Sequence, residues 1–160
     1  MQRQKFIVDA MLGRLARWLR ILGYDTYYKN DIEDWKILKI SQENNRIIVT
    51  RDRGLCIRAK KKGLPCELIE PGLNIEETLV KLANNWKIDL SLDLGATRCP
   101  ECNSVLEQIG KDRWKCSHCS KEYWKGTHWI TMQEIIIRAR TKVSINEDGR
   151  KTNFIGRSNS

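Results

Sequence analysis

The sequence predicts an α/β fold, a mostly parallel sheet with flanking helices, followed by a small module held together by four cysteines. Two observations lead to this prediction. Short apolar runs alternate four times with segments of helical periodicity up to Trp86, which is the order expected of a parallel sheet covered by helices. Beyond residue 97, four of the six cysteines fall in two Cys-x-x-Cys pairs, in a segment with too little aliphatic content for its own core.

The first half of the alternation is predicted from changes of period. Lys5–Asp9 is an apolar run that ends on an acid, which indicates a buried strand. Apolar residues then recur at helical spacing over Met11–Leu22, and Gly23 follows as a helix stop. A second strand is predicted over Thr26–Tyr28 and a second helix over Asp34–Asn44.

The second half repeats the pattern. Strands are predicted over Arg46–Thr50 and Cys66–Ile69, and helices over Gly54–Lys62 and Ile75–Trp86. The segment after Trp86 lacks a period and is expected to be a linker. One short helix is expected over Met132–Ala139, and a basic, disordered tail is expected after it.

Composition limits the classes of partner. The chain of 160 residues has 29 Lys and Arg against 20 Asp and Glu, a net charge of +9. This excess suggests a polyanionic partner, with nucleic acid ahead of a membrane surface. The longest apolar runs are far shorter than the ~20 residues of a spanning helix, so we expect neither a membrane span nor a signal peptide. The spacing of the cysteines favours metal ligation over a disulfide framework, and hence a reducing cytoplasm.

The paired cysteines predict a structural zinc, one per chain. The ligands would be Cys99, Cys102, Cys116 and Cys119. Each Cys-x-x-Cys turn can present two thiolates to one ion, and two turns complete a tetrahedral site. Such a site has no open coordination position, so the zinc would stabilise the module rather than react. A redox dithiol or disulfide bonds are the alternative.

Three acids are predicted to meet at one edge of the sheet. Asp9 ends the first strand, Asp34 opens the second helix and Asp52 follows the third strand. The carboxyl ends of parallel strands share one edge, where ligands usually bind. Clustered carboxylates suit Mg²⁺ or Mn²⁺, either of which can activate water for phosphodiester hydrolysis. Asp34 could instead be a helix cap, and Asp31 could stand in its place.

Arginines lie beside these acids in the sequence. Arg14, Arg17 and Arg20 recur every three residues on the first helix, and Arg51 and Arg53 flank Asp52. Guanidinium groups suit bidentate phosphate contacts that hold a nucleic-acid backbone without reading bases. A solvated helix face is the alternative for each of them.

The motifs together resemble a known family. They are DAMLGRLARWLR at residues 9–20, GYDT at 23–26, TRDR at 50–53, the two cysteine pairs and YWKGTHW at 123–129. In this order they resemble the PIN-like ribonuclease domain with a zinc ribbon that occurs at the carboxyl terminus of Mut-seven exonucleases and as stand-alone prokaryotic proteins. The resemblance implies a PIN-like sheet and a metal-dependent ribonuclease site, with Asp9 and Asp52 matching the strand-end acids and Asp34 the acid-led helix. Ser41 departs from the small apolar residue usual in that helix.

The sequence therefore predicts a cytoplasmic, divalent-metal-dependent endoribonuclease whose zinc ribbon assists RNA binding. The expected organisation is a PIN-like domain over 1–90, a linker over 91–97, the ribbon and short helix over 98–137 and the tail over 138–160. The alternative is a non-catalytic zinc-ribbon protein that binds RNA or acts as an adaptor. RNA is the expected partner and a membrane is not. The RNA target, the choice between Mg²⁺ and Mn²⁺, and any homo-oligomer or protein partner stay open.

Overall fold

A computed structural model of the chain describes residues 3–151, with side chains described as far as Val143. These residues form two compact units. The first contains the described residues up to Gly72 together with the segment Leu92–Trp124. The second contains Leu73–Ser91 and the described residues from Lys125 onward.

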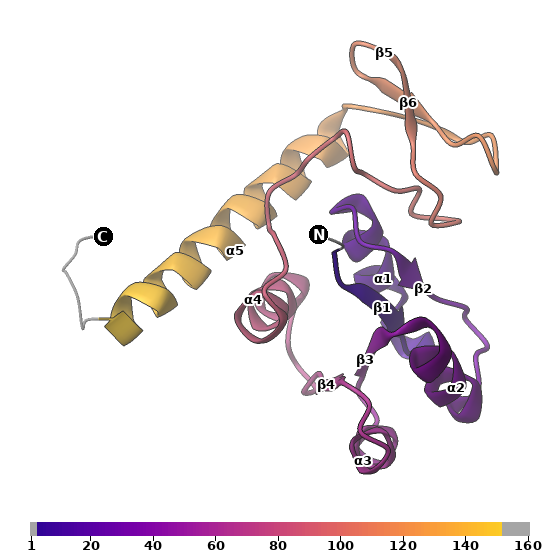
Figure 1. Cartoon of the computed structure of the whole chain (residues 1–160). Helices are drawn as coiled ribbons and strands as arrows, with labels where there is room; N and C mark the ends of the chain where they lie inside the picture. Colours follow the sequence, from indigo (N-terminus) through magenta and orange to yellow (C-terminus); the bar gives the residue numbers. More distant parts are fainter. Residues whose placement is uncertain (1–2, 152–160) are drawn as a thin grey trace. The chain divides into compact units, whose positions relative to one another are not determined.

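A four-stranded parallel sheet forms the centre of the first unit. Its strands are β1 (Lys5–Val8), β2 (Thr26–Tyr27), β3 (Arg46–Thr50) and β4 (Cys66–Leu68), in the spatial order β2-β1-β3-β4 (Figure 1). Every neighbouring pair is parallel. The α/β prediction is therefore confirmed. The strands β1 and β3 occupy the interior positions, where strands apolar on both faces are expected.

Three helices and a short 3-10 turn accompany this sheet. They are η1 (Ala10–Leu12), α1 (Gly13–Ile21), α2 (Asp34–Asn44) and α3 (Arg53–Lys61). The stop of α2 is Asn45, which takes the left-handed conformation at φ 54° and so ends the helix. At Gly13 a Cβ atom would lie 2.7 Å from the Tyr28 hydroxyl oxygen. Glycine at the start of α1 therefore lets Tyr28 approach the turn that follows Asp9.

An apolar cluster joins the sheet to α2 and α3. Its buried members are Ile7, Ile37, Ile48, Leu55, Cys56, Ala59 and Cys66. Ile7 and Ile48 are register partners in β1 and β3, so they project to the same face of the sheet, and α2 and α3 cover that face. Each fully buried aliphatic side chain contributes about 1.5–3 kcal/mol. This cluster therefore fixes the two strands that lead to Asp9 and Asp52.

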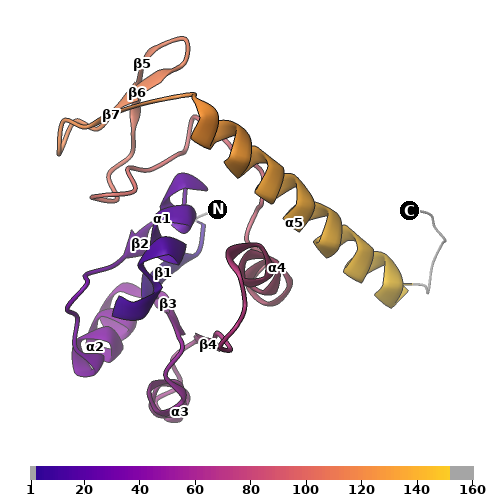
Figure 2. The ribbon, with the colours of Figure 1, turned by 180° about the vertical axis from the view of Figure 1, so that it is seen from behind.

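The cysteine-rich segment of the first unit forms an antiparallel sheet of three short strands. They are β5 (Glu107–Gly110), β6 (Arg113–Lys115) and β7 (Glu122–Trp124), in the order β5-β6-β7 (Figure 2). Trp114 of β6 is buried, whereas Trp124 of β7 is 66% exposed. Few apolar groups are buried here, as the sequence predicted, so the segment needs another source of stability. We refer to Arg98–Trp124 as the ribbon.

The second unit pairs two helices, α4 (Ile75–Trp86) and α5 (Thr127–Lys151). A capping box of Asn74 and Glu77 starts α4. Glu76 of α4 forms ion pairs with Arg138 at 2.8 Å and with Lys142 at 2.5 Å. Two basic residues expected to be part of a disordered tail are therefore bound to α4.

The expected short helix over 132–139 is wrong in its length, because α5 has 25 residues. The prediction relied on apolar periodicity, which fades after Ala139. No proline and no glycine interrupts the segment before Gly149, so a helix already formed can propagate through polar residues. Residues 152–160 of the predicted tail lie outside the described residues. The predicted domain boundaries stay predictions. Within residues 3–151, no helix is long and apolar enough to cross a membrane.

Candidate active site and metal centre

Two of the predicted acids are linked through one threonine at the carboxyl edge of the parallel sheet. Asp9 directly follows β1 and is only 8% exposed. Its Oδ2 accepts a hydrogen bond of 2.7 Å from the Thr50 hydroxyl. Thr50 ends β3, and its Oγ1 accepts a hydrogen bond of 2.9 Å from the backbone N–H of Asp52. One hydroxyl thus connects the Asp9 carboxylate to the segment that carries Asp52.

Asp52 combines a structural role with an exposed position. Its Oδ1 accepts a hydrogen bond of 3.1 Å from the backbone N–H of Leu55 and so caps α3. A cap of this kind stabilises a helix by about 1 kcal/mol. Within residues 3–143 its Oδ2 has no hydrogen-bond partner, and the residue is exposed. The cap therefore holds the side chain in place while one carboxylate oxygen faces outward.

Asp34 lies at the start of α2 and is paired with α3. Its Oδ2 is 2.9 Å from Nη2 of Arg58. The residue that precedes α2 as its cap is Glu33, so Asp34 does not cap this helix. Both partners are well exposed, which limits the value of such an ion pair to under about 1 kcal/mol. The sequence did not indicate Arg58 as a partner.

The three acids do not form a ready-made cluster of ligand atoms. Among the described residues, the four cysteines are the group of His, Cys, Asp or Glu side chains that could hold a metal ion. Their ligand atoms all lie within 4.8 Å of one another. Asp9, Asp34 and Asp52 form no second group of this kind in that part of the chain. A cation shared by all three, and Asp31 as a substitute for Asp34, stay predictions.

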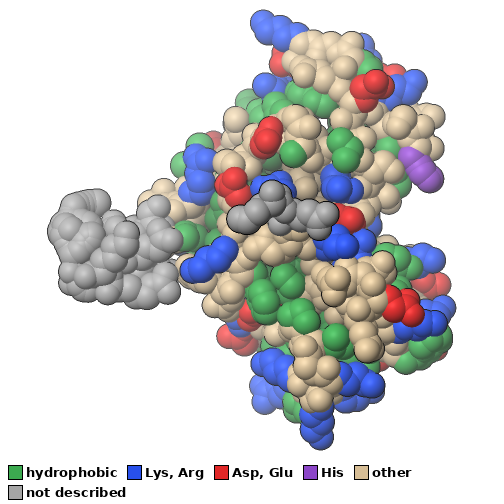
Figure 3. Space-filling view, in the orientation of Figure 1, with side chains coloured by type: hydrophobic (Ala, Val, Ile, Leu, Met, Phe, Trp, Pro, Cys, Tyr) green, Lys and Arg blue, Asp and Glu red, His purple; other side chains and the backbone are tan. Residues whose placement is uncertain are grey.

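Four of the five predicted RNA-binding arginines have exposed positions. Arg14 and Arg17 lie on α1, and Arg51 and Arg53 precede and begin α3. The Nε of Arg17 is 3.6 Å from a carboxylate oxygen of Glu101 in the ribbon. In the space-filling view, Lys and Arg side chains are spread over the visible face and are interleaved with acidic ones (Figure 3).

The fifth, Arg20, is only 6% exposed. Its Nε donates to the Thr26 carbonyl at 3.0 Å, and its Nη1 donates to the Pro100 carbonyl at 2.8 Å. Burial lowers the pKa of this guanidinium from its ordinary value. Arg20 therefore joins α1 to the ribbon, and its guanidinium is occupied by these two carbonyl groups.

We expect replacement of Thr50 by Val to lower the free energy of unfolding by about 1–3 kcal/mol, because buried polar partners lose a hydrogen bond. Valine keeps the shape but not the hydroxyl, so the Asp52 N–H loses its acceptor. Amide hydrogen exchange at Asp52 should then become faster. Thr50→Ser keeps the hydroxyl and is the matched control. Equal protection of the Asp52 amide in both variants would show that the hydroxyl link is unimportant.

The two cysteine pairs of the ribbon adopt the same backbone turn. In the first, the N–H of Asn103 donates to the Cys99 carbonyl at 2.8 Å, and in the second the N–H of Ser120 donates to the Cys116 carbonyl at 2.8 Å. Asn103 and Ser120 both have positive φ angles, 74° and 66°. Each turn therefore brings its two thiols to one side, as binding of a common ion requires. We call these turns the first and second knuckle.

The four sulfur atoms are placed for one metal ion. The Sγ atoms of Cys99 and Cys119 are 3.7 Å apart, and those of Cys102 and Cys116 are 3.2 Å apart. Disulfide bonds, at about 2.05 Å, do not fit these separations. A tetrahedral site with Zn–S bonds of roughly 2.3 Å has its sulfur atoms about 3.8 Å apart. The predicted metal-ligand arrangement of the four cysteines is confirmed.

The surroundings of the sulfur atoms shift the pKa values of two ligand thiols in opposite directions. Burial acts to raise the pKa of Cys102, but hydrogen bonds from Ser104 and from neighbouring thiols outweigh it and lower that pKa to about 6. Burial raises the pKa of Cys116 to about 11. The Tyr123 hydroxyl lies within hydrogen-bond distance of Cys99 Sγ, at 3.3 Å, and burial raises the pKa of this hydroxyl as well. Metal binding would therefore displace protons from this site.

The first knuckle is attached to the parallel sheet by side chains. The Asn103 Oδ1 accepts a hydrogen bond of 3.0 Å from the backbone N–H of Thr26, and its Nδ2 donates to Asp25 Oδ1 at 2.7 Å. The Thr97 hydroxyl donates to the Ile21 carbonyl at 2.6 Å. Together with Arg20, these contacts make the metal-ligand turn and the edge of the sheet one connected structure.

Comparison with known families gives a match over most of the chain. The model described as Mut7-C RNAse domain matches residues 4–115. The chain belongs to this family. The Mut7-C match confirms the resemblance that the motifs indicated. The comparisons with curated proteins and with solved structures found no match.

The Mut7-C match includes all three candidate acids and the first knuckle, and it ends one residue before Cys116. Membership indicates a nuclease or RNA-related role. Sequence reasoning missed Thr50 and Asn103 as positioning residues. Two signals in the sequence could have indicated them. Thr50 is a polar residue at the end of the otherwise apolar strand RIIVT, and Asn103 comes directly after the first Cys-x-x-Cys pair.

Proposed function

We propose that this chain is a divalent-metal-dependent endoribonuclease that cleaves RNA phosphodiesters at Asp9, Asp52 and Asp34. The observation that carries the proposal is the link between Asp9 and Asp52 through the Thr50 hydroxyl, in a chain of an RNAse domain family. Ligands of parallel α/β sheets bind at the edge where these residues lie. The acids follow neighbouring strands β1 and β3.

The donor set suits Mg²⁺ or Mn²⁺, because both prefer carboxylate oxygens. Asp9 and Asp52 would hold the ion, and Asp34 would join them once released from Arg58. When bound, such an ion lowers the pKa of water and stabilises negative charge on phosphate oxygens.

The chain's own groups hold and orient the RNA. The exposed guanidinium groups of Arg14, Arg51 and Arg53 bind backbone phosphates near the acids, and Arg17 does so in competition with Glu101. Thr50 keeps the Asp9 carboxylate in one orientation through its hydrogen bond of 2.7 Å. Contacts of this kind position a phosphodiester at the acids without selecting a base.

We assign a structural zinc to the four cysteines of the ribbon, because four thiolates form a closed tetrahedral set. The ribbon then assists RNA binding. Trp124 on β7 is well exposed and offers a ring on which an unpaired base can stack. The six cysteines, all within the described residues, form no disulfide bond, which supports a cytoplasmic location as part of the proposal.

The test uses the zinc-loaded full chain and a circular single-stranded RNA, which only an endonuclease can open. We expect linear products when Mg²⁺ or Mn²⁺ is added and none without added metal. RNA that is bound but never opened with either ion would favour the non-catalytic RNA-binding alternative. A chain that neither binds nor opens the RNA would favour the adaptor.

A further inference from the structure

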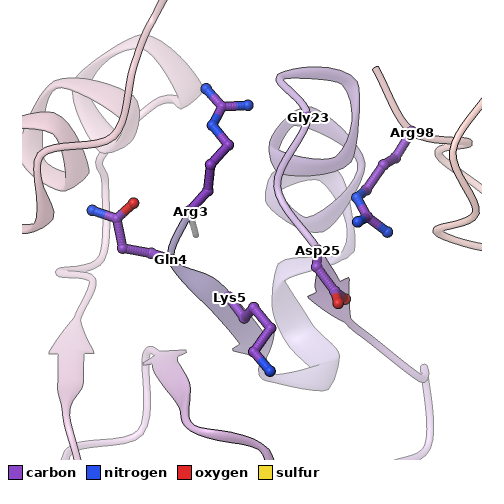
Figure 4. A pocket seen from close by; sticks show the side chains of 6 residues that line it. All are labelled: Arg3, Gln4, Lys5, Gly23, Asp25 and Arg98. Atoms are coloured by element: carbon purple, nitrogen blue, oxygen red, sulfur yellow. The ribbon is translucent and has the colours of Figure 1, made fainter. Parts of the chain in front are cut away.

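A basic pocket lies in the first unit, away from the candidate acids. It has a volume of about 390 Å³ and is lined by Arg3, Gln4, Lys5, Gly23, Asp25 and Arg98 (Figure 4). This volume lies in the range typical of small-ligand sites. Three of the six lining residues are cationic and one is acidic. None of them belongs to the proposed cleavage site.

The pocket lies at the amino edge of the parallel sheet. Lys5 is the first residue of β1, and Asp25 directly precedes β2. Asp9 follows the last residue of β1, so a strand of four residues, about 13 Å long, separates the two edges. A group bound in this pocket therefore cannot touch a phosphate that reacts at Asp9. It can hold a more distant part of the same ligand.

The first cation, Arg3, is held by its surroundings. Its guanidinium stacks over the ring of Tyr24, 4.1 Å from the centroid, and donates to the Leu22 carbonyl at 3.1 Å. Gly23 makes this approach possible, because a Cβ atom there would lie 2.6 Å from Arg3 Nη1. Gly23 also has φ 94°, a conformation that favours glycine. The wall of the pocket is thus built around a glycine.

The second cation, Arg98, comes from the ribbon. Its backbone N–H donates to the Arg20 carbonyl at 2.9 Å, and its Nη1 donates to the Asn103 carbonyl at 2.9 Å. Arg98 directly precedes Cys99. The first knuckle therefore presents this guanidinium to the pocket, while β1 supplies Lys5.

The acid in the pocket is already neutralised. Asp25 Oδ1 is 2.9 Å from Nη1 of Arg46 and accepts from Asn103. Burial opposes ionisation of this carboxyl, but the hydrogen bonds from Arg46 and Asn103 outweigh it and hold the pKa of Asp25 below its ordinary value. The carboxylate is thus charged and bound to Arg46. Against this one acid the lining has three cationic residues, Arg3, Lys5 and Arg98, so it keeps a net positive charge.

We propose that this pocket binds a phosphate group, through Lys5 and Arg98 beside the fixed guanidinium of Arg3. The phosphate group can come from two sources. The preferred one is a backbone phosphate of the RNA, several nucleotides from the cut, and this choice rests on the proposed function. A small free phosphorylated molecule has the same chemistry and is the second source. Guanidinium and ammonium groups recognise either through charge-assisted hydrogen bonds.

The experiment measures binding without cleavage, on the zinc-loaded full chain with no other divalent ion. Lys5→Gln is the main variant, because among the described residues the Lys5 ammonium forms no ion pair. Lys39→Gln, on the exposed side of α2, removes the same charge elsewhere and is the matched control. Lys5→Arg keeps the charge and should restore binding. Melting temperatures of all variants show whether each is folded. If Lys5→Gln does not fold, the response of the parent's Lys5 and Arg98 amide signals to inorganic phosphate decides the case.

We expect Lys5→Gln to weaken binding of a single-stranded oligonucleotide about threefold to tenfold. The slope of log affinity against log salt should flatten by roughly 0.7, the loss of one phosphate contact on a single strand. Lys39→Gln should change neither quantity. Binding of inorganic phosphate is followed by the backbone amide signals of position 5 and Arg98. If Lys5→Gln leaves RNA binding unchanged but weakens phosphate binding, the phosphate group that this pocket takes belongs to a small molecule. No effect on either probe would overturn the pocket as a phosphate site.

These readouts are independent of the cleavage test. A chain that opens circular RNA but shows no Lys5 effect keeps the proposed function and loses the pocket. A chain that never opens RNA but binds phosphate through Lys5 and Arg98 keeps the pocket and loses the nuclease.

Discussion

Replacing Asp9 by Asn should reduce metal-dependent RNA cleavage at least about a hundredfold while the protein stays folded. Loss of a residue that only supports a metal ligand typically costs about 10–100-fold, so loss of a ligand charge should cost at least the upper figure. The amide oxygen can still accept the hydrogen bond from the Thr50 hydroxyl. The fold should therefore survive while the negative charge is removed. Initial rates on circular RNA in Mg²⁺ and in Mn²⁺ measure the effect.

Three further variants sharpen this result. Asp52→Asn should be as severe as Asp9→Asn. Asp34→Asn should cost less than either of these, because that carboxylate must first leave its ion pair with Arg58 before it can join the metal. Glu43→Gln, at an exposed position of α2, removes one negative charge at the opposite end of that helix from Asp34. This variant should cleave RNA like the parent. Undiminished rates in both Asp9→Asn and Asp52→Asn would place the active site elsewhere.

Removing the metal should unfold the ribbon and destabilise the sheet beside it. Structural zinc contributes roughly 10–16 kcal/mol of apparent binding free energy in small modules, and the ribbon buries few apolar side chains that could replace it. Cys116→Ser should reduce zinc from one ion per chain to well below one, by elemental analysis. Fluorescence of the buried Trp114 should shift toward that of a solvated indole. Amide exchange at Thr26 should accelerate, because its acceptor Asn103 belongs to the first knuckle.

The matched control is Cys66→Ala, which removes a buried thiol outside the metal centre. It should retain one zinc per chain and a protected Thr26 amide. A Cys116→Ser protein with an intact ribbon and unchanged exchange at Thr26 would contradict both the zinc assignment and its coupling to the sheet.

Much of the fold could be predicted because local signals and tertiary packing agree. The helices over Asp34–Asn44 and Ile75–Trp86 and the strand over Arg46–Thr50 have the predicted bounds. Each helix combines an apolar period with a stop or a cap, and the strand is buried along its whole length. Ser41 stands where the resemblance implied a small apolar residue. It is buried, and its hydroxyl donates to the Arg46 carbonyl at 2.6 Å, so the polar group has a partner within its own helix–strand unit.

The candidate site was less predictable, because it depends on contacts between distant segments. The order of the strands makes Asp9 and Asp52 neighbours, and the motifs that contain these two acids could suggest this. The pairing of Asp34 with Arg58 depends on how α2 and α3 pack, which no spacing in the sequence encodes. Arg20 shared the spacing of Arg14 and Arg17, yet its burial follows from where the ribbon contacts α1. Periodicity identifies a helix face but not what covers it.

The Asn103–Thr26 hydrogen bond has a consequence for self-association. The strand β2 is at the end of the order β2-β1-β3-β4, and an outer strand with unpaired backbone groups is a template for pairing with another chain. The first knuckle places a side-chain oxygen on the Thr26 N–H and so blocks this edge. Loss of zinc therefore does more than release a small module. It uncovers a strand that can recruit a second copy, so zinc-depleted protein should form β-sheet aggregates that zinc-loaded protein does not.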